Sequence, residues 1–388
     1  MAPSAHPDIA IIGAGVHGAS AAYHLARSGA RVTLLERLSP AGGPTGLSSG
    51  ICRAYYTNLF LAEVARDSLR MMAAFDDVSP EHDAGYRRTG FLFLHPPEDA
   101  VEVRTTVARL NELGIRVDLY EPEALAREFQ QFELSGIGIG AFETDAGYAD
   151  PTGTTIGLAA AAVAAGAELR SRTDVVGLSA RQGGGAHLRL ADGSALETDR
   201  VLIAAGPWTA PLARQLDVEL PLTVERHVVA MARLDHARGV PFGHSDLGAG
   251  YYCRPEGSDQ YCIGWTHEAE EVDPDRFDRA IHSDEEIALL QAAARRLRAL
   301  EDAQPRSGWA SLYDISPDWQ PVIGEIVESV FVDAGTSGHG FKLAPALGRH
   351  VAELVLGRPD PRLAQFSPAR FATGELLHAG YREARILG

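Results

Sequence analysis

Three glycines close to the beginning of the chain have a spacing that could bring the backbone against a phosphate group. Gly13, Gly15 and Gly18 follow a short apolar run in the pattern G-x-G-x-x-G and open a stretch with helical character. Such glycines permit a tight turn, close approach of the backbone to a pyrophosphate and close packing of helix on strand. The N–H groups and dipole of the helix favour the same anion. We expect a dinucleotide here, in contact also with Val16 and His17.

An acidic residue at the end of the next apolar run narrows the choice of dinucleotide. Glu36 closes the run Arg31–Glu36, where a carboxylate can accept hydrogen bonds from the diol of a ribose. An acid at that point would repel the additional phosphate of NADP, so FAD or NAD is favoured. Arg37, the next residue, is expected to contact the same cofactor.

The elements that must position these residues form a βαβ unit. Asp8–Ile12 and Arg31–Glu36 are predicted strands, and Ala14–Ser28 between them is a predicted helix that Gly29 ends. About thirty residues are the length that such a unit needs. A strand, a glycine-rich loop and a helix are predicted again in Ser329–Gly357, near the other end of the sequence. One domain is therefore expected to be built from separated pieces of chain.

Further elements are predicted from periodicity and from cap residues. Asp150 and Pro151 precede a long alanine-rich helix and are typical of a helix start. The predicted helices elsewhere are Leu59–Phe75, Ala100–Leu113, Glu123–Phe129 and Ser283–Leu300, and the predicted strands include Thr89–His95 and Val201–Ala204.

Size and composition exclude several classes of protein. The 388 residues are enough for two domains, and 45% hydrophobic with 22% charged residues is ordinary for a soluble protein. A net charge of −17 argues against a nucleic-acid or anionic-membrane partner, although one local cation can still bind a small anion. Three cysteines, no CxxC pair and no His-x-x-x-His spacing argue against a disulfide scaffold and a metal. No signal peptide or membrane span is expected, so the predicted setting is cytoplasmic.

Four stretches spread over nearly the whole chain resemble the D-amino-acid-oxidase superfamily of FAD-dependent oxidoreductases, in particular its glycine oxidase and monomeric sarcosine oxidase branch. They are the N-terminal turn with Glu36, "LSSGICRAYYTN" (Leu47–Asn58), "VLIAAGPWT" (Val201–Thr209) and "DAGTSGHGFKLAPALG" (Asp333–Gly348). The last is the most specific, because it is far longer than a chance match between glycines. Resemblance of this kind supports fold and cofactor more firmly than substrate.

The resemblance implies an α/β fold with two domains. A Rossmann-like FAD-binding domain of the glutathione-reductase type is expected from residues 1–85, 144–215 and 325–388. An antiparallel-sheet substrate domain that roofs the flavin is expected from residues 86–143 and 216–324.

The resemblance also places the loop Thr336–Lys342 over the flavin ring. A helix from Ala344 would then direct its N-terminus at the flavin, where its dipole and Lys342 stabilise the negative charge of the reduced ring. Lys342 is the only lysine in the chain. The loop residues expected at the cofactor are Gly338, His339, Gly340, Phe341 and Lys342. Elsewhere the resemblance implies Ser48, Ser49, Gly50, Val175, Ala205, Gly206 and Trp208.

Several basic and aromatic residues are candidates for contact with substrate. The family commonly holds a carboxylate with an arginine near Arg53, and a guanidinium matches a carboxylate in a bidentate way. The alternative for Arg53 is pairing with a structural acid, and for Lys342 a position on the surface at the start of a helix. Tyr252 and Arg254 resemble residues on the substrate side, with a core aromatic and an exposed arginine as alternatives. His339 is the best placed of the histidines.

Two departures from the family bear on the cofactor and on its reoxidation. Sarcosine-oxidase-like members have a second arginine where this chain has Gly50, and a lysine for oxygen use near the position of Cys262, where none is present. Members with covalent flavin carry a cysteine near the position of Ser311 or a histidine near Ser48 and Ser49. We therefore expect non-covalent FAD and an electron acceptor that is either oxygen or another molecule.

The expected activity is FAD-dependent oxidation of a C–N bond in an amino acid or secondary amine. Hydride would pass to flavin N5, and the imine product would hydrolyse in water. The alternatives are a dehydrogenase that uses an acceptor other than oxygen and a non-catalytic FAD-binding subunit of a complex.

Overall fold

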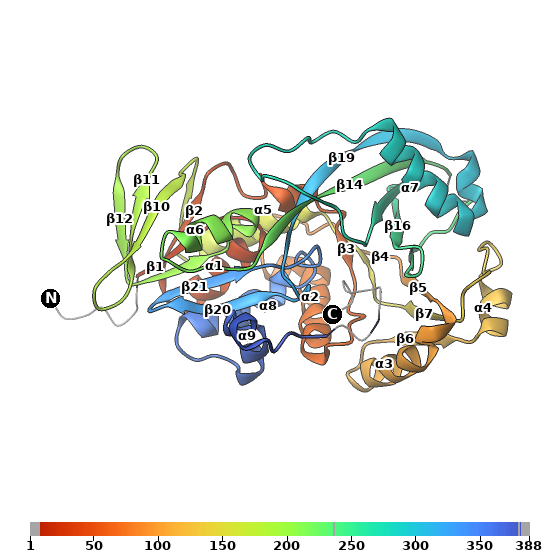
Figure 1. The fold of residues 1–388 in the computed structure, drawn as a ribbon, viewed down its shortest axis with the longest axis horizontal. Helices are drawn as coiled ribbons and strands as arrows, with labels where there is room; N and C mark the ends of the chain where they lie inside the picture. The colour runs from red at the N-terminus through yellow and green to blue at the C-terminus, as the bar shows by residue number, and fades with distance from the viewer. Residues whose placement is uncertain (1–7, 236, 379–380, 382–388) are drawn as a thin grey trace.

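Two sheets, lying side by side along the longest axis of the molecule, organise the chain (Figure 1). The computed structural model describes residues 8–235, 237–378 and 381. Residues 1–7, where no signal peptide is expected, and residues 382–388 of the predicted FAD-binding domain lie outside the described residues.

A six-stranded sheet forms the first part, in the order β20-β21-β13-β1-β2-β9. Neighbouring strands are parallel except for the edge pair of β20 and β21. The strands are β1 (Asp8–Ile12), β2 (Arg31–Glu36), β9 (Glu168–Ser171), β13 (Arg200–Ile203), β20 (Val322–Val327) and β21 (Val330–Ala334). Ile9 and Ile11 of β1 join one hydrophobic cluster, whereas Ala10 and Ile12 join another on the opposite face. Burial on both faces explains why this strand is apolar at consecutive positions.

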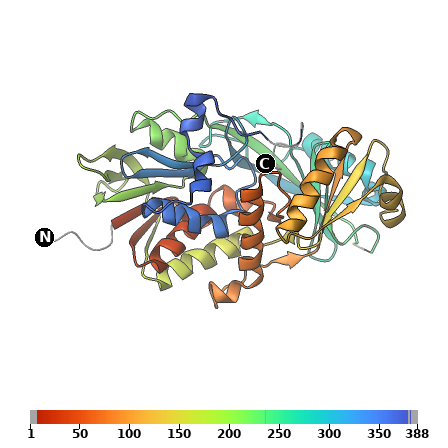
Figure 2. The same ribbon diagram turned by 90° about the horizontal axis from the view of Figure 1, so that it is seen from below.

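Helices cover one face of this sheet and a small sheet covers the other. α1 packs against both α5 and α8 (Figure 2). The helices of this part are α1 (Val16–Arg27), α2 (Leu59–Ala73), α5 (Pro151–Ala164), α6 (Thr209–Arg214), α8 (Ala344–Val355) and α9 (Ala369–Thr373). On the opposite face, α6 shares a hydrophobic cluster with the antiparallel sheet of β10 (Val175–Ala180), β11 (Ala186–Leu190) and β12 (Ala195–Thr198).

A nine-stranded sheet forms the second part. Its order is β18-β14-β17-β16-β15-β5-β7-β6, with β19 paired to β14. Its strands are β5 (Phe91–His95), β6 (Val117–Tyr120), β7 (Ile139–Glu143), β14 (Thr223–Arg233), β15 (Gly243–Asp246), β16 (Tyr251–Glu256), β17 (Gln260–Trp265), β18 (Glu270–Glu271) and β19 (Gln304–Ile315). Neighbours are antiparallel, as expected, except that β5 and β15 are parallel. α7 (Ser283–Arg296) contacts β14, β16, β17 and β19, while α3 (Ala100–Glu112) and α4 (Pro122–Glu128) contact β6 and β7.

The long strands β14 and β19 run side by side and lead from the second part back to the first (Figure 1). A short sheet of β3 (Ile51–Cys52), β8 (Gly147–Tyr148) and β4 (Arg87–Arg88) makes another connection. The division into domains at the predicted residue boundaries stays a prediction.

Local capping explains where two of these helices begin. The side chain of Asn58 accepts hydrogen bonds from the backbone of Phe60 and Leu61 at the start of α2, and Asp150 accepts one from Thr152 at the start of α5, as expected. The predicted helix Ser283–Leu300 is shorter in the structure, because Leu297 takes an extended conformation with φ −112° and ψ 91°.

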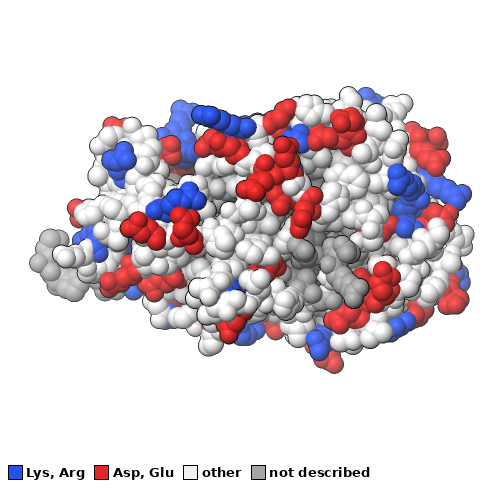
Figure 3. All heavy atoms as spheres, in the orientation of Figure 1, with Lys and Arg blue, Asp and Glu red and all other residues white. Residues whose placement is uncertain are grey.

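Charges are mixed over the surface. Figure 3 shows Arg side chains scattered among Asp and Glu on one face, without a broad basic area among the described residues of that face. In the described part of the chain, no helix combines the length and apolar character that crossing a membrane requires.

Candidate active site

A cavity of about 370 Å³ lies where β1, β13 and β21 end. That volume is in the usual range for a cofactor site. Both predicted glycine turns line it. The N-terminal turn contributes Gly13, Gly15, Val16 and His17, and the C-terminal loop contributes Gly338, Gly340 and Phe341. The structure thus brings together two turns from the two ends of the sequence.

The N-terminal turn needs its glycines for reasons of space. Gly13 has φ +102°, and a Cβ atom there would lie 2.5 Å from the carbonyl oxygen of Ala204. A Cβ atom at Gly18 would lie 1.9 Å from the carbonyl oxygen of Gly13. Gly18 does not line the cavity but lets α1 begin directly behind the turn. The N-cap residue of α1 is Gly15, which has no side chain to cap the helix, although Thr45 accepts from the backbone of Val16 at 3.3 Å, and the dipole at this end suits an anion.

The carboxylate of Glu36 is held at the end of β2. It accepts hydrogen bonds from the backbone N–H groups of Ala14 and Leu38, both 2.8 Å away, and lines the cavity. The other predicted cofactor contacts on this cavity are Arg37, Ser48, Val175, Ala205, Gly206 and Trp208. The guanidinium of Arg37 lies 3.8 Å from the ring centre of Trp208, and both side chains donate to Asp275 in the loop between β18 and α7.

A second cavity, of about 40 Å³, adjoins the first. The two share Ser48, Tyr313, Gly338 and Phe341 as lining residues. Of the predicted site residues, Ser49, Arg53, Tyr252 and Lys342 line this smaller cavity. Apolar side chains complete much of its wall: Ile51, Phe91, Phe93 and Leu247.

Arg53 and Lys342 supply positive charge to the smaller cavity. Both are buried, with 4% and 5% of their surface exposed. Arg53 donates to the carbonyl of Tyr55 at 2.5 Å, and its guanidinium lies 4.4 Å from the ring centre of Tyr56. Lys342 donates to the carbonyl of His339 at 3.4 Å. Burial, and then the charge of Arg53, hold the pKa of Lys342 well below its usual value.

One buried carboxyl group lies behind this cationic wall. Glu143 accepts hydrogen bonds from the backbone of Ala54 (2.8 Å) and Tyr55 (3.0 Å) and thereby fixes the segment that follows Arg53. Burial raises the pKa of Glu143 to about 7, against the opposing effects of these N–H groups and of Arg53. This role could not be predicted from sequence, because a glutamate at the end of a strand is more often exposed.

Tyr252 faces Tyr313 across the smaller cavity. The two hydroxyl groups interact, and burial raises the pKa of Tyr313 to about 12 and holds the pKa of Tyr252 well above its usual value. Both phenols therefore stay protonated over the working range of pH. Tyr313 also stacks on His227, with ring centres 3.9 Å apart. Tyr313 could not be predicted as a cavity residue, because a single tyrosine on a strand is indistinguishable in sequence from a core aromatic.

Four of the predicted site residues line neither cavity: Gly18, described above, and Gly50, Arg254 and His339. Arg254 donates to the carbonyl of Ser49 at 2.5 Å and to Glu256 at 2.6 Å, and so supports the loop from behind. Gly50, with φ +67°, forms the turn after Ser49. His339 points away from both cavities into the protein.

His339 is held in one tautomer by partners on both sides. Its Nε2 donates to the carbonyl of Trp319 at 2.9 Å, which leaves Nδ1 to accept from the hydroxyl of Tyr56 at 3.2 Å. Burial, and then the charge of Lys342, lower the pKa of His339 to about 3. His339 is therefore neutral and holds the loop Thr336–Lys342, called the flavin loop below after its predicted role, in place.

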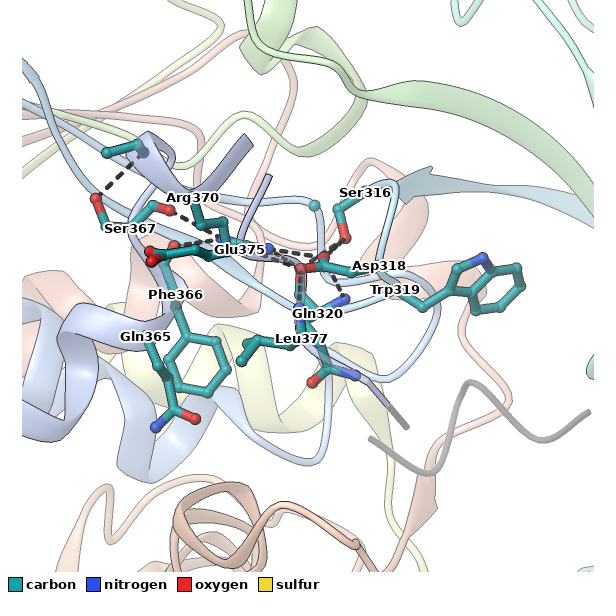
Figure 4. Close-up of polar contacts among 12 residues, drawn as sticks. Ser316, Asp318, Trp319, Gln320, Gln365, Phe366, Ser367, Arg370, Glu375 and Leu377 are labelled. Atoms are coloured by element: carbon teal, nitrogen blue, oxygen red, sulfur yellow. Dashed lines mark hydrogen bonds and ion pairs between the residues drawn. The ribbon is translucent and has the colours of Figure 1, made fainter. Parts of the chain in front are cut away.

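A buried ion pair fixes the segment that carries the Trp319 carbonyl (Figure 4). Arg370 of α9 donates to both carboxylate oxygens of Asp318, at 2.7 and 2.9 Å. Asp318 also accepts from the backbone of Gln320 and Leu377. Trp319 has φ +59°, an unfavourable conformation for a bulky residue, so its surroundings must impose it.

These features fit a dinucleotide with a flat head group. The N-terminus of α1 offers a helix dipole to a pyrophosphate, and Glu36 offers a fixed acceptor for a ribose. Buried Asp333 lines the cavity, and its Oδ1 atom has no hydrogen-bond partner among the described residues. A Cβ atom at Gly338 would lie 2.2 Å from the ring of Tyr313, so only glycine lets the loop pass there.

The chain is similar to known proteins along nearly its whole length. The family model for FAD dependent oxidoreductases (DAO) matches residues 8–354. Monomeric sarcosine oxidase from Bacillus sp. (strain NS-129) is 26% identical over 384 residues, which are 95% of this chain and 98% of that protein. Dimethylglycine dehydrogenase from Homo sapiens is 26% identical over 398 residues, which are 97% of this chain but 45% of that protein. The chain thus spans less than half the length of the latter.

A solved structure of similar sequence shares the fold. Glycine oxidase from Geobacillus kaustophilus matches with a TM-score of 0.79 and 25% sequence identity, over 94% of this chain and 99% of that one.

Proposed function

The chain belongs to the FAD-dependent oxidoreductase (DAO) family, and from this premise we propose that it oxidises the C–N bond of an amino acid or of a secondary amine that carries a carboxylate. The family assigns FAD as the cofactor and amine or amino-acid oxidation as the general activity. We propose the large cavity as the FAD site and the small one as the substrate site.

The pairing of Arg53 with Lys342 carries this proposal. Two cationic side chains on one small cavity, beside apolar walls, suit a compact anion. A carboxylate would lie against Arg53 and Lys342, and the remainder of the substrate would lie against Phe91, Phe93 and Tyr252. The names of two relatives, a sarcosine oxidase and a dimethylglycine dehydrogenase, support small amino acids with a substituted nitrogen.

In this mechanism the residues of the chain orient and desolvate the substrate. Bound FAD supplies a hydride acceptor for the carbon atom next to the nitrogen. The substrate must be a neutral amine to give up hydride, and a buried site with two cations lowers the pKa of an ammonium group. No dedicated base is then needed. Positioning of the carboxylate aligns the C–H bond, and the apolar walls exclude water until the imine product leaves and hydrolyses.

The N-terminus of α8 and Lys342 supply positive potential beside the flavin loop. α8 begins at Ala344, two residues after Lys342, and the hydroxyl of Ser68 accepts from the backbone of Ala346 in its first turn at 2.9 Å. Its dipole and an ammonium group at Lys342 would stabilise the negative charge of the reduced cofactor.

Two electron acceptors fit the proposal. Cys262 lies on β17, and no lysine is present on that strand to stabilise reduced oxygen. The alternative is therefore a dehydrogenase that passes electrons to another acceptor, as the name of one relative suggests. Mixing the reduced enzyme with air or with a redox dye separates the two, because a dehydrogenase reduces the dye rapidly and reoxidises slowly in air.

We propose that FAD is bound without a covalent bond. Ser311, which lines the large cavity, replaces the cysteine of covalent members. The three cysteines are buried, and none lines that cavity in the described structure. Acid precipitation should leave the yellow colour in the supernatant, whereas a coloured pellet would show covalent attachment.

Anaerobic reduction tests the activity directly. The oxidised holoenzyme is mixed separately with sarcosine, glycine, N,N-dimethylglycine and proline. The flavin absorbance near 450 nm is followed over about one turnover. Bleaching by at least one of these, but not by methylamine, supports the proposal. Absence of bleaching by any amino acid, in a preparation that contains FAD, contradicts it.

A further inference from the structure

His17 connects the two glycine turns through both of its ring nitrogens. It is the second residue of α1, within the N-terminal turn. Its Nδ1 lies 2.9 Å from Oδ2 of Asp333 on β21, and its Nε2 lies 3.2 Å from the carbonyl oxygen of Gly340 in the flavin loop. A residue of the first turn thus contacts two positions of the second.

The two partners fix the number of protons at this site. A carbonyl oxygen only accepts, so Nε2 must carry a hydrogen atom. A carboxylate also only accepts, so Nδ1 must carry another unless the proton lies on Asp333. Imidazole is the stronger base, with an ordinary pKa of about 6.5 against about 3.9 for Asp. The second proton therefore lies on the ring, and His17 is an imidazolium paired with the Asp333 carboxylate.

The surroundings stabilise this charged form. Burial alone would lower the pKa of His17, but the charge and hydrogen bond of Asp333, the charge of Asp314 on β19 and the Gly340 carbonyl outweigh it, so the pKa lies above its usual value. His339, another titratable group of the flavin loop, is neutral, because burial lowers its pKa to about 3.

The flavin loop packs tightly against the ring of His17. A Cβ atom at Gly340 would lie 2.7 Å from Nε2 of His17 and 2.5 Å from the Thr336 hydroxyl, so the loop can approach the ring this closely only with glycine. On the other side, Oδ2 of Asp333 is engaged by His17, while Oδ1 is buried without a hydrogen-bond partner among the described residues. Asp333 lines the large cavity, so an unpaired acceptor is available where FAD would lie.

We propose that His17 is a positioning residue for the cofactor. Its imidazolium donates hydrogen bonds to Asp333 and to the Gly340 carbonyl and so holds the two glycine turns together. The second carboxylate oxygen of Asp333 then accepts a hydrogen bond from a hydroxyl group of FAD. The inference rests on the use of FAD and is independent of the substrate.

One proton then contributes to cofactor affinity. The pyrophosphate of FAD adds negative charge near the start of α1, which raises the pKa of His17 further when FAD binds. Below the pKa of the apoprotein, His17 is charged in both states and the Kd for FAD does not change with pH. Between the pKa values of the apoprotein and the holoprotein, binding takes up a proton and the Kd rises by about tenfold per pH unit. Above both values the Kd is constant again and weaker.

The experiment is titration of apoprotein with FAD between pH 5.5 and 9.5, read by quenching of flavin fluorescence. Wild type is compared with His17→Gln, which keeps a polar side chain but cannot carry charge. The matched control is His24→Gln. His24 is also on α1 and also bonds a carbonyl near the C-terminus, that of Pro345 at 3.0 Å, but it has no carboxylate partner in the described structure, and burial lowers its pKa to about 4.

Wild type and the two variants should differ in their affinity for FAD at low pH. His17→Gln should bind FAD about 10-fold to 100-fold more weakly below pH 7, the cost of removing one charged hydrogen-bonding partner, and its Kd should not rise with pH through this group. His24→Gln should follow wild type. An unchanged Kd in His17→Gln, or a pH dependence equal to that of wild type, would overturn the proposal.

A second measurement remains available if His17→Gln folds poorly. The ring protons of histidine report protonation by NMR, and Asp333→Asn removes the partner charge without changing His17. In wild-type apoprotein the His17 resonance should titrate above pH 6.5, and in Asp333→Asn it should move to lower pH. A resonance that titrates below pH 6 in wild type contradicts the imidazolium. If wild type itself fails to bind FAD, the assignment of the cofactor fails instead.

Discussion

Arg53 and Lys342 line one cavity, and the charge of Arg53 contributes, after burial, to the low pKa of Lys342. The segments that carry these residues come from opposite ends of the chain: Arg53 follows β3 and Lys342 precedes α8. Two cations so placed repel each other until an anion arrives between them. The pair is thus arranged to respond to a carboxylate.

Binding of a carboxylate should therefore take up a proton. Burial and the charge of Arg53 hold the pKa of Lys342 well below its usual value in the free enzyme, and a bound carboxylate raises that pKa again. Calorimetric titration of the holoenzyme with acetate or benzoate, in two buffers of different ionisation enthalpy, measures the uptake. We expect measurable proton uptake in wild type and markedly less in Lys342→Met. Equal uptake in both would contradict this assignment.

Replacement of Arg53 should act on substrate affinity more than on turnover. Arg53→Met removes a charged hydrogen-bonding partner of the carboxylate, a loss of about 1.5–3 kcal/mol, so KM should rise about 10-fold to 100-fold. Steady-state kinetics with an amino acid separate KM from kcat, and the FAD content of the variant should equal that of wild type. An unchanged KM, or loss of FAD together with activity, would indicate that Arg53 acts only through the fold.

Gly13 and Gly43 offer a matched pair on the large cavity. Both line it, but a Cβ atom at Gly13 would lie 2.5 Å from a carbonyl oxygen, whereas one at Gly43 would meet nothing within 4 Å. Gly13 also has φ +102° and Gly43 φ −99°. We expect Gly13→Ala to purify with little or no FAD and Gly43→Ala to keep a full complement, measured by the ratio of absorbance at 450 and 280 nm. Full FAD content in Gly13→Ala would show that the turn can relax.

Breaking the ion pair of Asp318 and Arg370 should lower the free energy of unfolding far more than breaking a surface ion pair. Both side chains are nearly fully buried, so removing one partner leaves an uncompensated charge. Arg370→Met should lower the free energy of unfolding by about 3–5 kcal/mol. The control, Arg362→Met, breaks exposed contacts with Asp360 and Glu63 and should cost less than about 1 kcal/mol. Urea denaturation of the holoenzyme measures both.

A combined variant tests the origin of that loss. Asp318→Asn together with Arg370→Met removes both charges and should recover part of the stability. If the single and double variants are equally unstable, packing rather than charge is responsible.

The backbone turns of the site could be predicted from sequence, because their residue types are set locally. G-x-G-x-x-G requires glycine for reasons that lie within a few residues, and Glu36 ends a strand whose apolar run is visible in the sequence. The cofactor, the family and the fold followed from these and from the longer C-terminal stretch. The parallel pair of β5 and β15 could not be foreseen, because pairing depends on the whole sheet.

The directions of side chains could not be predicted in the same way. His339 is adjacent to two cavity-lining glycines, yet it points to the carbonyl of Trp319, whose conformation depends on an ion pair with α9. Arg254 follows Tyr252 by two residues on β16 but reaches the backbone of Ser49 instead of a cavity. Each orientation depends on a partner distant in sequence, for which one sequence holds no signal.

The raised pKa of Glu143 predicts how the free energy of unfolding changes with pH. Its pKa is about 7 in the folded protein and about 4.5 when unfolded, so the folded state binds the proton more tightly. Its favourable contribution is complete below pH 4.5 and is lost as pH rises from 4.5 to 7, by about 3 kcal/mol in order of magnitude. Glu143→Gln carries no charge and does not suffer this loss, although its amide leaves one of the N–H groups of Ala54 and Tyr55 without an acceptor, at a cost of about 1–3 kcal/mol.

Urea denaturation at pH 5 and pH 8 measures the effect. The free energy of unfolding of Glu143→Gln relative to wild type should improve at the higher pH. Glu121→Gln, at an exposed pair with Arg104, is the control and should show no such improvement. A relative stability of Glu143→Gln that is the same at both pH values would mean that the Glu143 carboxyl stays ionised in the folded protein, stabilised by its two N–H donors and Arg53.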